Sequence, residues 1–314
     1  MNYLKDYREG EKFFGTYLCK QKQILKTKAG KTYYSLTLQD KTGTADGKIW
    51  ELNNGIANFE PMDYIHCEGM VTSFQGNLQM NISRVRISDE GEYDPADYVP
   101  CTNKDVGEMF SRILKYVASV QNKYLRKILE MYFVENKEFV DAFKKHSAAK
   151  SVHHGFMGGL LEHTLSVTDM CQYFAEHYPM IHRDLLITAA LFHDMGKIQE
   201  ISDFPMNDYT DDGQLLGHIY IGARCMENAA AQIPNFPPKL KNELVHCILA
   251  HHGKMEFGSP KVPAIMEAMA LHMADNADAK LQTLTEVFTQ AGDNMGWLGF
   301  NRMFESNLRK TSEE

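Results

Sequence analysis

The residue pair His193-Asp194 constrains this chain more than any other feature, because it directly follows an apolar helical run. Leu185–Phe192 form that run, and Met195, Gly196 and Lys197 come directly after the pair. An imidazole and a carboxylate are costly to bring into apolar surroundings unless they are paired or bind a cation. The pair therefore predicts a divalent metal site at the end of a buried helix.

Other imidazoles and carboxylates fall at similar places along the second half of the chain. Eleven of the thirteen histidines lie between His153 and His272, which places the site in the C-terminal two-thirds. Helices are predicted over 158–178, 184–195, 217–232, 238–252 and 262–291 from their apolar periodicity. The candidate ligands on or beside these helices are His163, His193, Asp194, His218, His251, His252 and Asp275.

Seven ligands are too many for one ion but suit two ions that share a carboxylate. We assign His163, His193, Asp194 and Asp275 to the first ion, and Asp194 (as the bridge), His218, His251 and His252 to the second. Imidazole with carboxylate suits Mn²⁺, Co²⁺, Fe²⁺ or Zn²⁺ better than Ca²⁺ or Mg²⁺ alone. Two ions about 4 Å apart lower the pKa of a shared water and stabilise an in-line displacement at phosphorus. Asp194 and Lys197 are therefore the expected catalytic residues, with Lys197 neutralising a phosphate oxygen.

Several of these assignments have alternatives. Adjacent helical residues diverge by about 100°, so His251 and His252 both bind metal only if the helix ends there. Asp278 competes with Asp275, because it lies one turn further along nearly the same helix face. His154 either contacts the substrate or caps a helix, and Lys197 is otherwise an ordinary solvated lysine.

The N-terminal part has a different pattern, with alternating polar and apolar residues typical of β-strands. Strands are predicted over 13–25, 32–39, 44–52, 63–74 and 77–87, with 53–59 as a short helix or turn and a hairpin at Gln75-Gly76-Asn77. Five strands with an insert between the third and the fourth is the layout of an OB barrel. The expected fold is a multi-domain α and β chain: a five-stranded OB-type barrel over 1–88, an acidic proline-containing linker over 89–101, and an all-α helical bundle over 102–314 with its metal core at about 150–280.

An OB barrel binds single strands by stacking bases on exposed aromatic side chains within a basic groove. Tyr33 lies on the strand face opposite Tyr34, Leu36 and Leu38, so we expect it to be exposed. Lys48 and Trp50 share one face of the third strand, and Phe74 ends the fourth. The expected nucleic-acid-binding residues are Tyr33, Lys48, Trp50, Phe74 and, near the metals, His154.

Charge and composition limit the partners and the compartment. The net charge is −8, but residues 1–90 carry a balance of +1 and the remainder −9, so a polyanion is attracted by local lysines and bound cations rather than by the overall field. The six cysteines are scattered without a CxxC spacing, which is typical of reduced thiols in the cytoplasm. No apolar run is long enough to predict a membrane span or a secretion signal.

The pattern H…HD…D, given by His163, His193-Asp194 and Asp275, resembles the HD phosphohydrolase superfamily. The three further histidines resemble its two-metal branch. Gly158–Thr164 and Phe192–Lys197, behind an OB-like module, are similar to the YhaM family of 3′→5′ exoribonucleases. That resemblance implies hydrolysis of single-stranded RNA, with single-stranded DNA as a second candidate, to nucleoside 5′-monophosphates with Mn²⁺ as the favoured metal. The direction of cleavage rests on the resemblance alone.

Two rival functions are kept. The first is an HD phosphodiesterase or nucleotidase for small nucleotides with a regulatory OB module. The second is a non-catalytic RNA-binding protein with a structural metal, which the large ligand set disfavours because structural sites need fewer ligands. Assembly into a homo-oligomer is left open, and the apolar segment 296–300 must dock on this chain or on a neighbour.

Overall fold

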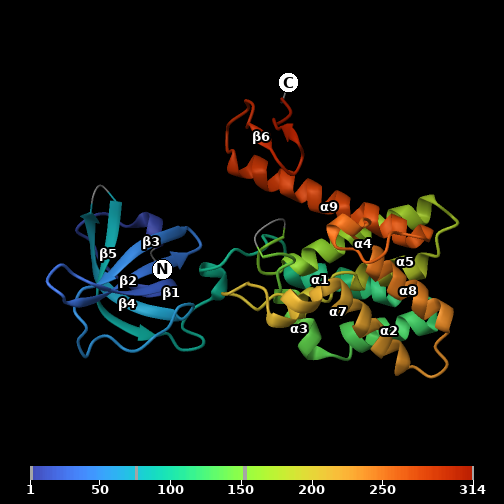
Figure 1. Ribbon diagram of the computed structural model, residues 1–314, viewed down its shortest axis with the longest axis horizontal. Helices are drawn as coiled ribbons and strands as arrows, with labels where there is room; N and C mark the ends of the chain where they lie inside the picture. The colour runs from blue at the N-terminus through green and yellow to red at the C-terminus, as the bar shows by residue number, and fades with distance from the viewer. Residues whose placement is uncertain (1–2, 75–76, 151–153, 313–314) are drawn as a thin grey trace. The chain divides into compact units, whose positions relative to one another are not determined.

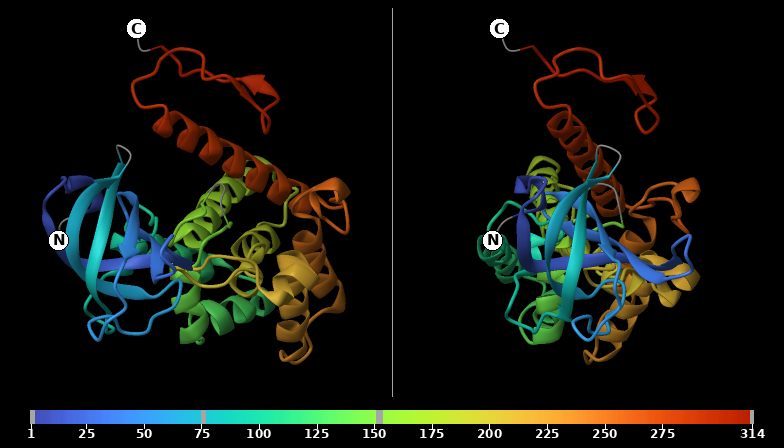
Figure 2. Two further views of the ribbon diagram at one scale, coloured as in Figure 1. Left: turned by 60° about the vertical axis from the view of Figure 1, so that its left-hand side comes forward. Right: turned by 90° about the vertical axis from the view of Figure 1, so that its left-hand side faces the viewer.

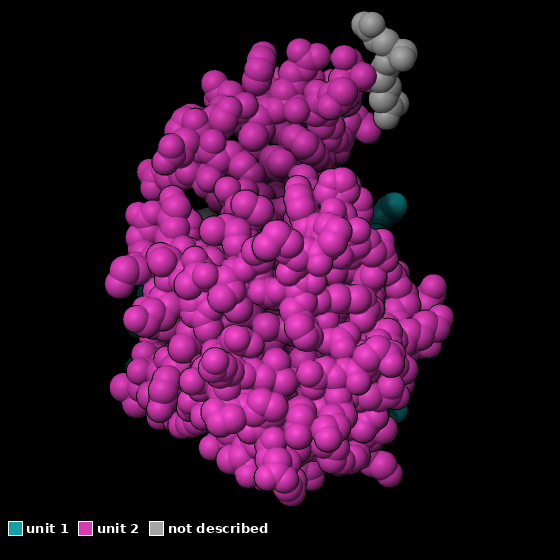
Figure 3. Space-filling model, turned by 90° about the vertical axis from the view of Figure 1, so that its right-hand side faces the viewer, with its two compact units in different colours: residues 1–101, 204–206 teal, residues 102–203, 207–314 magenta. Residues whose placement is uncertain are grey.

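The computed structural model describes residues 3–74, 77–150 and 154–312. The chain divides into two compact units, residues 1–101 with 204–206 and residues 102–203 with 207–314 (Figures 1 and 3). Within the described ranges, no helix combines the length and the apolar character needed to cross a bilayer.

The first unit is a closed five-stranded barrel. Its strands are β1 (Lys12–Lys26), β2 (Thr32–Asp40), β3 (Gly43–Ile49), β4 (Tyr64–Phe74) and β5 (Asn77–Ile87). They follow the order β1-β2-β3-β5-β4 and close through the antiparallel pairing of β1 with β4. The β3–β5 pair is parallel, while β2 pairs antiparallel with β1 and β3. The predicted OB-like barrel is confirmed.

Alternation along the strands fills the interior of the barrel. Leu36 and Leu38 are buried, as expected from the pattern over 32–39, and they pack with Ile49 and Ile65 in one apolar cluster. Residues 53–59 form a turn rather than a helix, and Phe59 in this segment is buried in the same cluster. Residues Gln75 and Gly76 of the predicted hairpin lie outside the described residues, although Phe74 pairs with Asn77.

The segment 89–101 packs against the barrel, where the sequence predicted a linker. Tyr93 stacks on Tyr64 with ring centroids 4.0 Å apart, and Tyr98 is 2 % exposed. The short 3-10 helix Pro95–Asp97 ends in a carbonyl that accepts a hydrogen bond from the Lys41 backbone N–H. The acidic residues and prolines of this segment predicted a solvated linker. Tyr93 and Tyr98 instead hold the segment on the barrel, because packing their rings there removes apolar area from water.

The second unit is helical. Its helices are α1 (Val106–Ser119), α2 (Lys123–Phe133), α3 (Lys137–Lys145), α4 (Gly159–His177), α5 (Arg183–Phe192), α6 (Lys197–Glu200), α7 (Asp211–Ala231), α8 (Pro238–Ala250) and α9 (Met266–Gln290). Helix α5 is buried along Leu185–Phe192 and contacts α2, α4, α8 and α9. This central position explains why its sequence is apolar on all sides.

The C-terminal segment extends away from the helical body. Figure 2 shows the second half of α9 leaving the body and leading to a small hairpin. Its strands are β6 (Phe300–Asn301) and β7 (Ser306–Asn307), so the second unit is not entirely helical. Trp297 and Phe300 are 69 % and 67 % exposed. The apolar segment 296–300 is therefore not buried against the described part of this chain, which leaves a neighbouring chain as the other expected docking surface.

Candidate metal centre

Four elements of the helical unit bring their ends or inner faces to one buried point. His163 lies on the buried face of α4, and His193 caps the C-terminus of α5. Asp194 follows in the turn before α6, and Asp275 lies on α9. The α5 sequence sets this arrangement, because an all-apolar helix must stay in the core and so delivers its terminal His-Asp pair there.

The first group of ligand atoms surrounds a single position. The Nε2 atom of His163 lies 3.1 Å from Nε2 of His193, 3.3 Å from Oδ2 of Asp194 and 3.2 Å from Oδ1 of Asp275. Candidate ligand atoms of His163, His193 and Asp275 all lie within 4.8 Å of one another. This spacing matches atoms that share one bound ion, since metal–ligand bonds to nitrogen and oxygen are about 2.0–2.2 Å long.

The hydrogen bonds of the two imidazoles fix which nitrogen is free. Nδ1 of His193 lies 2.8 Å from the carbonyl oxygen of Ala190, and a carbonyl only accepts, so this Nδ1 carries the proton. Nδ1 of His163 lies 2.7 Å from Oδ2 of Asp278 and is a donor by the same argument. When His163 is in its neutral form, both Nε2 lone pairs face one another beside two carboxylates, an arrangement that a cation stabilises.

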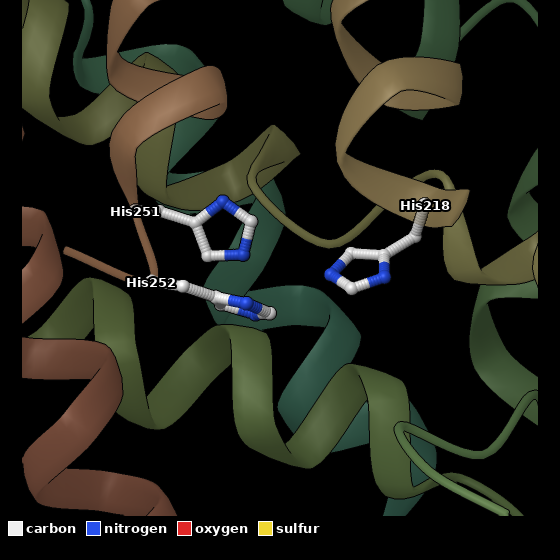
Figure 4. A group of neighbouring side chains, drawn as sticks. All are labelled: His218, His251 and His252. Carbon is white, nitrogen blue, oxygen red and sulfur yellow. The ribbon is translucent and has the colours of Figure 1, made fainter. Parts of the chain in front are cut away.

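The second group consists of His218, His251 and His252, whose rings point toward a common space in Figure 4. Helix α8 ends at Ala250, with His251 as its C-cap in helical conformation and His252 in the turn that follows. Gly253 completes the turn at φ +79°, and a Cβ there would overlap the ring of His272. Nδ1 of His251 and of His252 face the carbonyl oxygens of Ile248 and Phe257 at 2.7 and 2.8 Å, so each ring has its Nε2 available.

His218 reaches the group through a break in its helix. The sequence predicted that a helix begins at Gly217, whereas α7 begins at Asp211 and is interrupted at Gly217, where φ is 74° and ψ is 153°. That conformation favours glycine. The helix restarts at His218, whose backbone N–H and Nδ1 both lie 2.9 Å from Oε1 of Glu200.

Asp194 lies between the two groups. Its Oδ2 faces His163 and His193 at 3.3 and 3.4 Å, and its Oδ1 faces His218 and His251 at 3.4 and 3.6 Å. The residue is 2 % exposed. Although Lys197 forms an ion pair with Oδ2, neither carboxylate oxygen has a well-directed hydrogen bond to a described residue, and neither do Nε2 of His218 and of His251. Unpaired buried acceptors of this kind fit a site built for divalent cations.

The charges in the site are coupled. Burial alone favours the neutral form of Asp194, but Lys197 and His193 hold its pKa well below the ordinary value. Burial alone favours neutral Lys197, yet Asp194, whose Oδ2 is 2.6 Å from Nζ, raises the pKa of this lysine. Burial lowers the pKa of His251, and it lowers the pKa of His252 to about 4. These two imidazoles are therefore neutral at pH 7, the form that binds metals.

A cavity of about 450 Å³ opens onto both groups. Its lining includes His163, His218, His252, Asp275 and Lys197, and also Tyr209 and Phe257. The two aromatic side chains are 46 % and 56 % exposed. The cavity thus combines ligand atoms, one buried cation and two aromatic surfaces, which suits an anionic substrate with a ring.

Comparisons with known proteins show the family to which the chain belongs. The HD domain family model matches residues 160–280. The 3'-5' exoribonuclease YhaM of Geobacillus sp. (strain WCH70) is 32 % identical over 81 % of this chain and 78 % of its own length, and that of Bacillus subtilis (strain 168) is 32 % identical over 81 % of each. The chain belongs to the YhaM family. The second OB-fold domain of replication protein A from Methanococcus maripaludis is also similar, at 20 % identity over 29 % of this chain and 98 % of that one, with a TM-score of 0.24.

The structure brings together all seven metal ligands expected for this YhaM-family chain, but it places His154 differently. His154 is 1 % exposed, and its Nε2 lies 3.0 Å from Oδ2 of Asp278. A side chain buried to this extent cannot contact RNA, so its expected nucleic-acid role is corrected. Asp278 accepts a hydrogen bond from Nδ1 of His163, on the side of the ring away from the proposed ion, whereas Asp275 lies beside Nε2.

Glu200 is a residue of the metal centre that the sequence did not point to. Its contact with His218 becomes visible only when α6 and α7 are in place. The one available signal was its position three residues after Lys197, on the same short helix.

The barrel of the YhaM-family chain presents most of the predicted aromatic residues at its surface. Tyr33 stacks on Trp50 with centroids 4.6 Å apart, and Trp50 and Phe74 are 40 % and 60 % exposed. Nζ of Lys48 lies 2.7 Å from Oγ of Ser35 and 2.6 Å from Oδ1 of Asp46. Phe14, which is 77 % exposed, was missed because it lies within a strand that reads as core.

Proposed function

We propose that the chain is a metal-dependent 3′→5′ exoribonuclease that hydrolyses single-stranded RNA to nucleoside 5′-monophosphates. The observation that carries this proposal is Asp194, which faces three-residue ligand groups on both of its sides. The relatives, each named 3'-5' exoribonuclease YhaM, support the reaction and its direction. Single-stranded DNA is the second candidate substrate.

The two ligand groups define which residues would hold each ion. His163, His193 and Asp275 would hold one, His218, His251 and His252 the other, with one oxygen of Asp194 for each. Two bound divalent cations would supply Lewis-acid polarisation of the phosphate and a water of lowered pKa. Mn²⁺ is the first choice because mixed imidazole and carboxylate ligands suit it, and Co²⁺, Fe²⁺, Zn²⁺ and Mg²⁺ are the alternatives.

Lys197 and the aromatic residues of the cavity would orient the substrate. Lys197 Nζ is held by Asp194 and lines the cavity, so it would neutralise a non-bridging phosphate oxygen. Tyr209 and Phe257 are exposed at the same cavity and would contact the terminal nucleotide through its base or ribose. This division leaves positioning and electrostatics as the main contributions of the protein, as expected for phosphoryl chemistry.

The barrel would capture the single strand. The stacked pair of Tyr33 and Trp50 offers an aromatic surface, and Lys48 lies two residues before Trp50 near the end of β3. Stacking on such a surface tolerates any base. The barrel would therefore raise the affinity for RNA without selecting a sequence.

A time course on a 5′-labelled single-stranded RNA of about 30 nucleotides, with Mn²⁺ or with EDTA, tests this function. We expect a ladder that shortens from the 3′ end and mononucleotide products, with no reaction in EDTA. An RNA with a 3′-terminal phosphate and an RNA duplex with blunt ends serve as substrate controls.

RNA that remains intact with Mn²⁺ present would refute the exonuclease function. A screen of mononucleotides and cyclic dinucleotides would then test the small-nucleotide phosphodiesterase. Internal cleavage that yields fragments instead of mononucleotides would equally contradict the proposal, because the enzyme would be an endonuclease.

We also propose that the chain self-associates through its C-terminal hairpin. Trp297 and Phe300 expose two large apolar side chains on one small element, and water-exposed patches of this kind mark interaction sites. Light scattering after gel filtration, on the wild-type chain and on Trp297→Ser/Phe300→Ser, measures the effect. An unchanged molar mass would contradict the proposal.

A further inference from the structure

The five ligand imidazoles differ in what holds their outer nitrogen. Nδ1 of His193, His251 and His252 each faces a backbone carbonyl. Nδ1 of His163 instead faces Asp278 at 2.7 Å, and Nδ1 of His218 faces Glu200 at 2.9 Å. Each of the two ligand groups thus contains one imidazole that is paired with a carboxylate.

This difference has a chemical consequence. A charged acceptor polarises the Nδ1–H bond more than a neutral carbonyl does, so it makes Nε2 a stronger donor to a metal. It also fixes the tautomer and the ring plane. The carboxylate-paired imidazole is therefore the ligand through which the protein adjusts the affinity of each ion.

Asp278 is built into a network that holds it rigidly. Its Oδ2 also lies 3.0 Å from Nε2 of His154, and its Oδ1 accepts a short hydrogen bond from Ser166. It is 7 % exposed. Asp275 and Asp278 are three residues apart on α9, and His163 and Ser166 are three apart on α4. Helices α4 and α9 thus provide two proposed ligands, His163 and Asp275, and also the two residues that support them, Ser166 and Asp278.

Glu200 is fixed in another way. Both contacts come from His218, since the backbone N–H and Nδ1 each lie 2.9 Å from Oε1. The break at Gly217 leaves this N–H without a partner in the preceding turn, and Glu200 takes the place of a helix N-cap. The same carboxylate oxygen therefore sets both where the helix restarts and where its first side chain points.

We propose that Asp278 and Glu200 are positioning residues, each of which sets the metal affinity of a different ligand group through one imidazole, His163 or His218. The inference rests on the proposed metal-dependent function but concerns ion binding rather than RNA. One competing arrangement is a further ion held by His154, His163 and Asp278, which lie close enough together. It would require both nitrogens of His163 to bind metals, so we treat it as an outcome to test.

The test measures Mn²⁺ binding to metal-free protein by titration calorimetry for Asp278→Asn, Glu200→Gln and the exposed control Asp293→Asn. The wild type is expected to bind two ions. Each substitution near the site should weaken one ion about 10–100-fold and leave the other within a few-fold, and the control should match the wild type. In the double variant Asp278→Asn/Glu200→Gln, both ions should be weakened.

A second measurement distinguishes an effect on the ligand imidazoles from a general loss of folding stability. The absorption bands of Co²⁺-loaded protein report the ligand field, so Asp278→Asn and Glu200→Gln should each change the spectrum of one ion. A milder variant, Ser166→Ala, guards against misfolding of Asp278→Asn. It should weaken the first ion alone by a few-fold, with unchanged thermal unfolding of the metal-free chain.

Several results would overturn the proposal. The first is that Asp278→Asn and Glu200→Gln both keep the wild-type Mn²⁺ affinities and Co²⁺ spectra. The second is that each variant weakens both ions equally and also lowers the thermal stability. The third is that the wild type binds a third ion, which Asp278→Asn removes. A wild-type chain that binds no Mn²⁺ would overturn it together with the proposed function. Two ions bound as expected, with RNA left intact, would refute the exoribonuclease alone.

Discussion

Asp194 offers the sharpest test of the metal centre, because each of its two carboxylate oxygens faces a different ligand group. We consider Asp194→Asn, which keeps the shape of the side chain and removes its charge. The carboxylate is one of two that face the inner ligand atoms, with Asp275 as the other. The substitution therefore halves the inner negative charge that would offset two divalent cations.

The size of the effect follows from the charges. A divalent ion about 4 Å from a carboxylate gains about 8 kcal/mol at an effective dielectric constant of about 20. Part of this gain is offset in the wild type, because the metal-free carboxylate is already paired with Lys197, whose positive charge also repels the ion. A net loss of about 4 kcal/mol remains, which is about a thousandfold in affinity for each ion.

Calorimetry with Mn²⁺ and the RNA time course measure the two consequences. We expect no detectable binding of either ion at micromolar protein and no mononucleotide product, while RNA affinity stays within a few-fold of wild type because the barrel is intact. Asp293→Asn is the exposed control. The substitution also leaves Lys197 without its buried partner, which costs about 3–5 kcal/mol of stability if the lysine stays charged.

Asp194→Asn/Lys197→Met removes that complication and should restore thermal stability without restoring metal binding. The reasoning would be refuted if Asp194→Asn still bound two ions with affinities within tenfold of wild type. Loss of only one ion would show that Asp194 is not a bridge and that the two groups are independent.

Three further predictions concern pH, one ligand and the barrel. Burial lowers the pKa of His163, but its contacts with Asp194, Asp275 and Asp278 outweigh this and raise that pKa well above the ordinary value; since a metal must displace this proton, Mn²⁺ affinity should rise with pH beyond about 6.5, the pKa of an ordinary histidine. Calorimetry between about pH 6 and 9 checks this, and a flat profile above neutrality would contradict it. His252→Ala should weaken one ion at least about tenfold while the exposed control His177→Ala has no effect; equal binding by both variants would remove His252 from the ligand set. Tyr33→Ala/Trp50→Ala should raise the KM for a long single strand about 5–100-fold, from about 1–3 kcal/mol of stacking, and leave kcat on a dinucleotide unchanged, whereas Tyr173→Ala should change neither; a loss confined to kcat would place these aromatic residues outside the binding path.

The sequence alone determined the elements that depend on local pattern. The apolar run before His193-Asp194 predicts a buried helix that ends in a metal site, and α5 ends one residue before this pair. Alternation over 32–39 predicts which face of β2 is buried, because successive strand residues point to opposite sides. Both inferences rest on periodicity, which each stretch of chain carries by itself.

Tertiary structure decided the features that depend on distant segments meeting. Asp275 and Asp278 are nearly equivalent on α9, and only the packing of α4 places one at the inner Nε2 of His163 and the other at its outer Nδ1. His154 is buried, and its Nε2 lies 3.0 Å from Oδ2 of Asp278. Hydrogen bonds of this kind join atoms more than a hundred residues apart, so no spacing within one helix could reveal them. The sequence determined which side chains are available for metal chemistry, and the packing of α4, α5, α8 and α9 decided which nitrogen or oxygen of each faces the ions.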